Sequence, residues 1–261
     1  QMLLHPKIDL QLPLAEVTLA ECLKEAGYAT ACVGKWHLGS AGFSPDKQGF
    51  DFVHIGQANT KPSETEGGKG EYDLTNAALN FIEQKKDKPF FLYIPHNNPH
   101  IPLAAKPELI KKYQDSFNPT YAAVIHTLDD TVGLLMKKLD ELKLTENTIF
   151  IFTSDNGGLH VLEFPLSPAT HNTPYRAGKG FLYEGGLRVP LIVRWPKSIP
   201  AKRVLDTPIM NTGWLPTLVE FAGAKLPKTT LDDSSFAKLL TGHRYEAPPH
   251  YWHSSNPAIT C

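Results

Sequence analysis

The pattern of apolar and polar residues predicts helices over residues 72–84, 118–143 and 212–222. In the longest of these, apolar residues recur at intervals of three and four, and Asn118 and Pro119 form a favourable start. A further helix is predicted to begin at the capping box of Thr18 and Glu21 and to end at Gly27. The long apolar stripe is interpreted as core.

Short runs rich in β-branched and aromatic residues predict strands between these helices. The runs cover residues 28–33, 89–95, 149–152 and 189–193, and the last two are expected to be buried. Because strands and helices alternate along the chain, the fold class predicted is α/β. In an open α/β sheet, ligands bind beyond the carboxyl ends of the strands.

Polar side chains follow three of the predicted strands. Lys35 and His37 follow the first, His100 follows the second, and Asp155 and Asn156 follow the third. Asp-Asn-Gly-Gly after a strand is on its own most often a turn. A carboxylate and an amide oxygen are nevertheless the hard ligands that Ca²⁺ or Mg²⁺ accepts. Three strand ends that carry such groups together indicate a site.

Lys179 lies between two glycines, where the backbone can approach a ligand closely. A metal together with lysines suits the binding of a sulfate or phosphate ester. The pattern of a P-loop is absent around Lys179 and around residues 67–70. Residues 67–70 are interpreted as a surface loop, within a polar loop over 57–72 near the site.

Four segments in this order resemble the sulfatase family: GYATACVGKWHLG, NNPHIPL, TSDNGG and RAGKGFLYEGGLRVP. The resemblance runs from about Leu14 to Trp195 and is looser beyond. It implies an alkaline-phosphatase-like fold, with a mixed, mostly parallel sheet flanked by helices. It also implies a divalent cation, usually Ca²⁺, and hydrolysis of sulfate esters.

The resemblance also implies roles for individual residues. Asp155 and Asn156 match the residues that ligate the cation. Lys35 and Lys179 match the lysines that bind the sulfate oxygens, and Lys179 also the one that faces the leaving-group oxygen.

Among the histidines, His100 matches the one that contacts the sulfate ester and assists protonation of the leaving group. His37 matches the one that binds the hydroxyl of a formylglycine nucleophile. Glu184 and Arg188 are interpreted as a structural ion pair. His160 and His171 flank the polar insert, where they could face substrate, and are interpreted as exposed loop residues.

The chain departs from the family at the nucleophile. The family makes formylglycine from a Cys or Ser in a C/S-x-P/A-x-R motif, upstream of the GKWH segment and after paired aspartates that complete the metal site. Cys22, Cys32 and Cys261 lack the required Pro and Arg, so the motif is absent. We therefore expect residues 1–245 to be a sulfatase catalytic domain without its N-terminal part, 246–261 to begin a small C-terminal subdomain, and the chain alone to be inactive.

Composition is that of an ordinary globular protein, with 41% hydrophobic residues, 20% charged residues and a net charge of −1. No basic bias favours nucleic acid. No apolar run approaches the length of a membrane span, which is about 20 residues. Three cysteines define no disulfide framework. No signal peptide is visible, and although the family is usually exported, the compartment is not predicted.

Two other functions are compatible with the same residues. Sulfate and phosphate esters are isosteric, so a phosphodiesterase or phosphonate hydrolase of the same superfamily would use a similar cation cluster. A non-catalytic remnant would bind anions weakly and turn nothing over. The predicted partner is a sulfated small molecule or a sulfated carbohydrate, and the segments 40–72 and 159–173, where specificity would lie, name no substrate.

Overall fold

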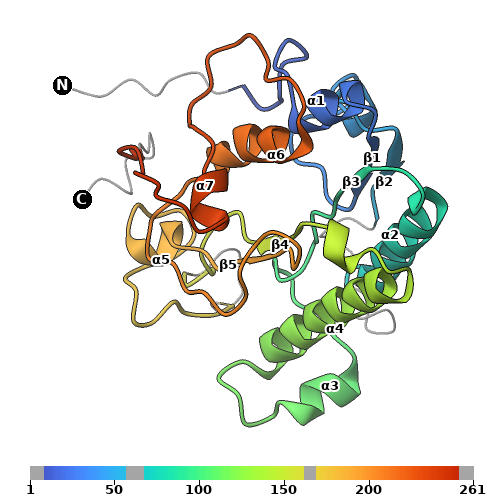
Figure 1. Ribbon diagram of the computed structural model, residues 1–261. Coiled ribbons are helices and arrows are strands. Elements are labelled where there is room, and N and C mark those ends of the chain that lie inside the picture. The colour runs from blue at the N-terminus through green and yellow to red at the C-terminus, as the bar shows by residue number, and fades with distance from the viewer. Residues whose placement is uncertain (1–8, 57–67, 162–168, 253–261) are drawn as a thin grey trace.

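The computed structural model describes residues 9–56, 68–161 and 169–252 (Figure 1). The helices are α1 (Leu19–Glu25), α2 (Glu71–Lys85), α3 (Pro107–Lys112), α4 (Pro119–Glu141), α5 (Glu184–Leu187), α6 (Trp214–Ala222) and α7 (Ala237–Leu240). The strands are β1 (Ala29–Val33), β2 (Phe52–His54), β3 (Phe90–Tyr93), β4 (Phe150–Thr153) and β5 (Leu191–Arg194). Short 3₁₀ turns cover Pro45–Lys47, Thr145–Asn147 and Asn211–Gly213.

The strands form two groups. In the first, β1 is central and pairs in parallel with β2 and β3. In the second, β4 and β5 pair in antiparallel fashion, with Ile151 opposite Val193. Within the described part of the chain, β3 has only β1 as a strand neighbour and β4 has only β5. The predicted α/β fold class is confirmed.

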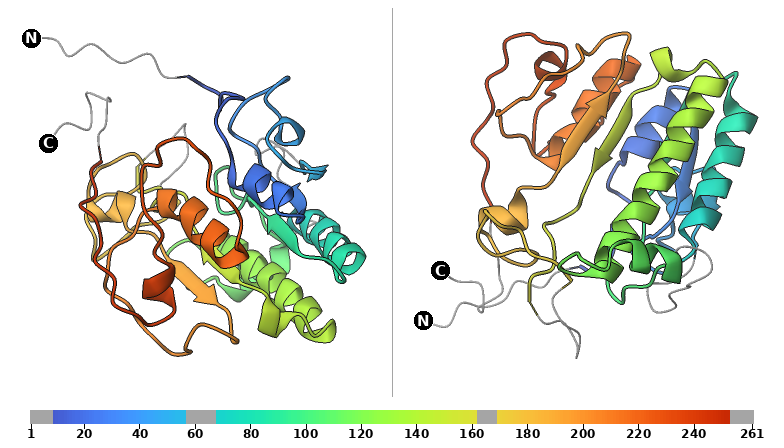
Figure 2. Two further views of the ribbon diagram at one scale, coloured as in Figure 1. Left: turned by 45° about the horizontal axis from the view of Figure 1, so that its top comes forward. Right: turned by 90° about the horizontal axis from the view of Figure 1, so that it is seen from below.

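Strand β1 is buried on both faces. Ala31 and Val33 point into a core formed with α2 and α4, whereas Cys32 points into a second cluster with Ala20 of α1. This follows from the two-residue period of a strand, which sends neighbouring side chains to opposite faces. Figure 2 shows α2 and α4 side by side along one side of the strands. The carboxyl end of β1 is thereby fixed between two helical layers.

The predicted helix signals hold at atomic detail. Thr18 and Glu21 form the capping box. The Asn118 side chain accepts a hydrogen bond from the backbone N–H of Tyr121 at 3.0 Å. Gly223 ends α6 in the left-handed conformation. The helix predicted over 212–222 begins as a 3₁₀ turn and becomes α-helical at Trp214.

The expectation that the strands over 149–152 and 189–193 are buried is wrong. In β4 the residues before Thr153 are only half-buried, and Thr153 is exposed. Among the described residues β5 pairs with β4 alone, and Leu191 and Ile192 are 36% and 63% exposed. The three-residue β2 and the one-and-a-half-turn α3 were not predicted, because each is too short to show a period. Residues 250–252, within the segment expected to begin a C-terminal subdomain, have no regular structure, and residues 253–261 lie outside the described residues.

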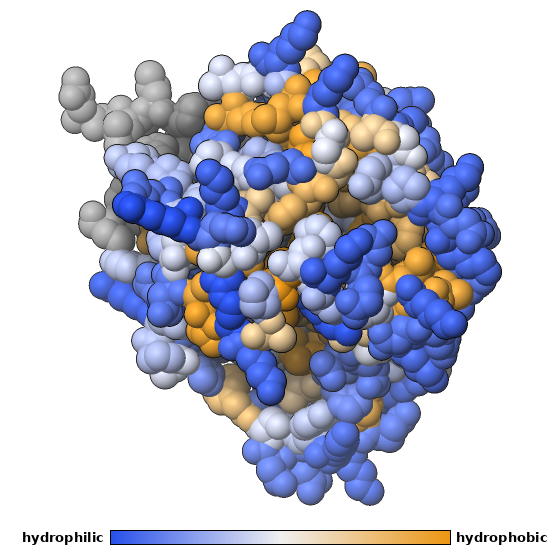
Figure 3. Space-filling model, in the orientation of Figure 1, coloured by the Kyte–Doolittle hydropathy of each residue, from blue (hydrophilic) through white to orange (hydrophobic). Residues whose placement is uncertain are grey.

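The face of the molecule seen in Figure 1 is mostly polar at its rim, with apolar surface nearer its centre (Figure 3). Helices α6 and α7 cover one side of β5, where Phe236, Leu239 and Leu240 form a small core with Val193.

Across the described ranges, no helix combines the length and apolar character needed to cross a bilayer.

Replacing Thr18 with Ala tests the capping box. The Thr18 hydroxyl accepts a hydrogen bond from the Glu21 N–H and donates one to the Gln48 carbonyl. We expect Thr18→Ala to lower the free energy of unfolding by about 1 kcal/mol, measured by urea denaturation. The exposed Thr229 gives a matched control, Thr229→Ala, which is expected to leave stability unchanged. Equal effects of the two substitutions would contradict the role of the cap.

Candidate active site

Lys35 follows β1, and its backbone is in close contact with the loop after β3. The N–H of Lys35 donates to the carbonyl of Pro95 at 2.7 Å, and the N–H of Gly34 donates to the carbonyl of His54 at 2.8 Å. Gly34 has a φ of +133°, and a Cβ there would lie 2.2 Å from the Pro95 oxygen. Only glycine allows this approach, which joins the backbone of Lys35 to the loop that carries His100.

His100 is held between two partners. Its Nδ1 lies 2.7 Å from the carbonyl oxygen of Ile101, and its Nε2 lies 3.2 Å from Nζ of Lys179. A carbonyl only accepts, so Nδ1 carries the hydrogen. An ammonium only donates, so Nε2 offers it a lone pair. The geometry therefore selects the neutral imidazole with Nε2 as an acceptor.

The surroundings of His100 favour the same state. Burial lowers the pKa of His100, and the positive charges of Lys179, Lys35 and Lys69 lower it further. The hydrogen bond to the Ile101 carbonyl opposes this by stabilising the protonated form. Lysines from three separate segments thus act on one imidazole, and His100 is neutral at neutral pH.

Lys69 belongs to this cluster, although its position was predicted to be a surface loop. That prediction is wrong for residues 68–70, and Gly67 lies outside the described residues. Lys69 is 1% exposed, and its ammonium donates to the backbone carbonyl of His100. Burial lowers the pKa of Lys69 to about 8; the carboxylate of Glu71 opposes the shift and Lys35 adds to it. The Gly-rich segment gave no sign of this burial.

Glu71 is the second functional candidate that the pattern did not reveal. Its side chain is fully buried. One carboxylate oxygen accepts hydrogen bonds from the N–H groups of Asn97 and Asn98, at 3.1 and 2.9 Å. The other lies 2.6 Å from Nδ1 of His96. A single carboxylate therefore binds three donors at the start of the His100 loop.

The predicted metal segment and the lysine loop are joined backbone to backbone. The N–H of Lys179 donates to the carbonyl of Gly158 at 3.1 Å, and that of Gly157 donates to the carbonyl of Gly186 at 3.0 Å. A Cβ on Gly157 would lie 1.7 Å from the Gly185 oxygen. The glycines of the DNGG and YEGG segments therefore allow the two backbones to pack closely against each other.

Asn172 reinforces this junction from inside the polar insert. Its Oδ1 accepts from the N–H of Gly158 at 2.9 Å. Its Nδ2 donates to the carbonyls of Gly158 and Ala177, at 2.9 and 3.0 Å. One amide side chain thus ties the segment after β4 to the turn before Lys179, and Asn172 had no motif to mark it.

Asp155 and Asn156 lie at the carboxyl end of β4, as predicted. The Nδ2 of Asn156 donates to the carbonyl of Gly157 at 2.9 Å, and the Oδ1 of the same amide is the atom that can accept or bind a cation. Asp155 is exposed, and it lies near enough to Tyr93 to reinforce the rise that burial causes in the pKa of that phenol. Both oxygens suit a hard cation.

These two residues supply only part of a coordination shell. Over residues 9–56, 68–161 and 169–252, no group of three or more His, Cys, Asp and Glu side chains is placed to hold a metal ion. A Ca²⁺ ion takes six to eight oxygens in typical sites. The pair therefore fits one side of a cation site.

The other predicted positions separate into three outcomes. His37 is exposed, and the described residues offer it no hydrogen bond or ion pair to the His100 cluster. The ion pair predicted between Glu184 and Arg188 is confirmed, at 3.1 Å and exposed. His171 is exposed as predicted, but His160 is not: it is half-buried and packs against Phe181, with ring centroids 5.1 Å apart.

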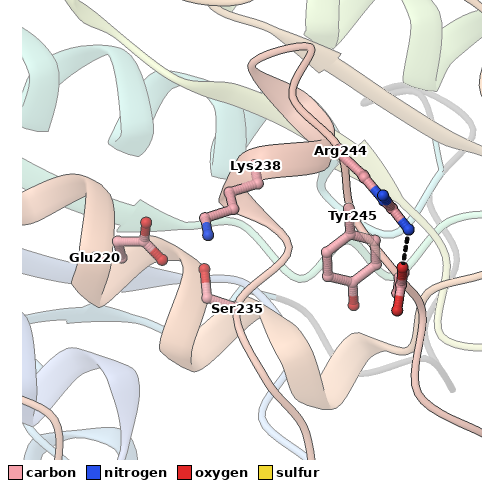
Figure 4. A pocket seen from close by; sticks show the side chains of 6 residues that line it. Glu220, Ser235, Lys238, Arg244 and Tyr245 are labelled. Atoms are coloured by element: carbon pink, nitrogen blue, oxygen red, sulfur yellow. Dashed lines mark hydrogen bonds and ion pairs between the residues drawn. The ribbon is translucent and has the colours of Figure 1, made fainter.

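A surface pocket of about 390 Å³ lies elsewhere, on α6, α7 and the segment after them (Figure 4). Its lining residues are Glu220, Ser235, Lys238, Arg244, Tyr245 and Glu246. In Figure 4 the side chains of Glu220, Ser235 and Lys238 point toward one another. None of the lining residues belongs to the segments that carry the cation cluster, so the pocket is separate from the candidate site.

Comparison with known proteins identifies the family. The sulfatase family model matches residues 3–224. Arylsulfatase A of Homo sapiens is 32% identical, over 88% of this chain and 52% of that protein. N-acetylgalactosamine-6-sulfatase of Canis lupus familiaris is 35% identical, over 92% of this chain and 52% of that protein. The chain thus spans about half the length of the curated relatives it matches.

A solved structure agrees with this result. The crystal structure of Ps i-CgsB in complex with k-i-k-neocarrahexaose superimposes with a TM-score of 0.78 at 28% identity, covering 92% of this chain and 61% of that one. The sequence match, the shared fold and the segments that meet at His100 and Lys179 lead to one conclusion. The chain belongs to the sulfatase family, in the alkaline phosphatase superfamily.

Proposed function

We propose that this chain is the anion-binding part of a sulfuric ester hydrolase. The observation that supports this most directly is the contact between His100 Nε2 and Lys179 Nζ at 3.2 Å, with Lys35 close enough to affect the pKa of His100. The Lys179 ammonium contacts the neutral imidazole, and the Lys35 ammonium acts on it electrostatically. The segment that follows Asp155 and Asn156 is joined by backbone hydrogen bonds to the loop that carries Lys179. Such a site suits a tetrahedral anion with an ester oxygen to be released.

The lysines would hold the ester. Their ammonium groups donate to sulfate oxygens and stabilise the negative charge that grows there in the transition state. Lys179, which already donates to the Nε2 of His100, would face the leaving-group oxygen. His100 keeps the hydrogen on Nδ1 and a lone pair on Nε2, so it orients the Lys179 ammonium. That ammonium would then give a proton to the leaving-group oxygen and become a neutral amine.

Asp155 and the Oδ1 of Asn156 would bind a divalent cation, with Ca²⁺ the ion the oxygen ligands favour. When bound, that ion polarises the ester and neutralises its charge. Because the pair fits one side of a coordination shell, further oxygen ligands would have to complete it. His37, exposed after β1, is assigned to the hydroxyl of a formylglycine nucleophile.

The cysteines with described side chains do not provide that nucleophile. Burial raises the pKa of the Cys32 thiol to about 12, and burial together with Glu25 and Glu21 raises the pKa of the Cys22 thiol. Both are buried thiols rather than reactive thiolates. With the C/S-x-P/A-x-R motif absent from the sequence, we infer that the chain alone binds sulfate but does not turn it over.

The substrate class proposed is a sulfated carbohydrate or small sulfate ester. One similar protein is named for N-acetylgalactosamine 6-sulfate chemistry, another as an arylsulfatase, and a similar structure was solved with a neocarrahexaose. The family match favours sulfate over the phosphoryl chemistry that the same cluster would tolerate. A purely structural remnant is distinguished by whether the cluster binds sulfate at all.

Sulfate binding should depend on Lys179. We expect Lys179→Met to weaken binding of inorganic sulfate about tenfold or more, measured by calorimetric titration, because a charge-assisted hydrogen bond is lost. The exposed Lys197 on a distant loop serves as the control, and Lys197→Met is expected to bind like the parent chain. If neither the parent nor the variants bind sulfate, the proposed site is wrong.

The cation should act through Asp155. We expect Ca²⁺ to strengthen sulfate binding, and chelation to reverse the gain, because the ion adds positive charge at the anion site. Asp155→Ala should remove the calcium dependence, whereas Asp115→Ala, at an exposed carboxylate elsewhere, should retain it. A calcium effect that survives Asp155→Ala would place the ion somewhere else.

Turnover provides an independent check. The chain as it stands should release no detectable nitrophenol from an aryl sulfate in the presence of Ca²⁺, because it lacks a nucleophile. A polypeptide that also carries an in-frame C/S-x-P/A-x-R segment, with the cysteine converted to formylglycine, should hydrolyse it. Hydrolysis by the chain alone would refute the assignment.

A further inference from the structure

Two buried charged residues stand at the start of α2. Lys69 is 1% exposed and Glu71 is fully buried, and neither is part of the motifs that mark the family. Lys and Glu are almost never fully buried unless they have partners. Both have partners here, and these include backbone groups of one loop, residues 96–100, together with the side chain of His96.

We propose that Lys69 and Glu71 are positioning residues for His100: together they hold the 96–100 loop so that the Nε2 of His100 faces Lys179. The role in chemistry rests on the function proposed for His100. The geometric part, a clamp on the loop that carries the imidazole, stands without it.

Glu71 binds the first three residues of the loop, 96–98. Its carboxylate accepts from two consecutive backbone N–H groups, those of Asn97 and Asn98, and from His96. Because three donors converge on one carboxylate, the turn is fixed in direction as well as in distance. A fully buried carboxylate without these donors would carry a large desolvation cost.

Lys69 binds the last residue of the loop. Its ammonium donates to the carbonyl of His100, the residue whose side chain must be aimed. This arrangement is costly, because Lys69 is desolvated and lies near the like charge of Lys35. The carboxylate of Glu71 offsets part of that cost. A fold that retains a charged lysine there gains a donor with a fixed direction.

The clamp also sets the charge environment of His100. The groups that act on its imidazole are Lys179 from the loop before α5, Lys35 after β1, Lys69 before α2, and the Ile101 carbonyl. All three lysines oppose a proton on Nε2. Removing Lys69 therefore changes both the position of His100 and its readiness to take a proton.

The imidazole of His100 can be followed directly by NMR of the labelled chain without any substrate. In Lys69→Met, which keeps the length of the side chain and removes the charge, we expect the pKa of His100 to rise by roughly half a pH unit or more. Lys86→Met is the matched control: Lys86 caps the other end of α2 and pairs with the partly exposed Glu83. It should leave the pKa unchanged. An unchanged pKa in Lys69→Met would overturn the proposal.

The parent chain gives a second test that does not depend on how the variant folds. The pKa of Lys69 is about 8, so the ammonium is charged below that pH and loses its proton above it. The ¹³C signal of the His100 carbonyl should therefore shift with a midpoint near pH 8. The shift should be absent in Lys69→Met if that variant folds. A carbonyl signal that is flat across this range in the parent would refute the contact.

Glu71→Gln tests the contacts that Glu71 makes with residues 96–98. It removes one acceptor while keeping size, so the amide protons of Asn97 and Asn98 should exchange faster, and the preference of His100 for a hydrogen on Nδ1 should weaken. Unaltered exchange and tautomer would count against the clamp. These readouts need no sulfate: if they hold and sulfate does not bind, the function fails and the clamp stands. If sulfate binds and they fail, the reverse is true.

Discussion

The crowding of positive charge around His100 is the constraint on which this site depends. Lys35, Lys69 and Lys179 all depress the protonation of one imidazole, in a chain whose net charge is −1. Like charges brought together from three segments repel one another, so the fold must supply the force that keeps them there. In return, the site presents a local positive field that an anion with several oxygens can neutralise.

Backbone contacts supply that force more than side-chain packing does. Gly34 lets the end of β1 touch Pro95, and Gly157 lets the segment after β4 touch the chain at Gly185. Hydrogen bonds from the N–H groups of Lys35 and Lys179 complete each junction. The lysines therefore lie on backbone segments that are hydrogen-bonded to one another. These contacts limit how far charge repulsion can separate the lysine side chains. The close approaches at Gly34 and Gly157 therefore fix the backbone that carries the lysines.

Sequence patterns predicted what local periodicity encodes. The apolar runs located β1, β3 and β4, and the polar residues that follow them could be named because strand ends face the ligand side of a sheet. The side of β5 that is exposed could not be predicted, because burial depends on which strand lies next to it. Lys69 was misinterpreted because its glycine neighbours are typical of surface turns. Its burial, like that of Glu71, arises from tertiary contact with the His100 loop, and nothing in the adjacent sequence specifies it.

The division of the strands into two groups has a consequence for handling the polypeptide. Among the described residues, β3 and β4 each pair along one edge only, and Ile192 of β5 is 63% exposed. A strand edge with an apolar neighbour is a template on which another copy of the chain can add its own strand. Concentrated solutions should therefore accumulate intermolecular β-structure, and conditions that cover those edges will govern how much monomer survives purification.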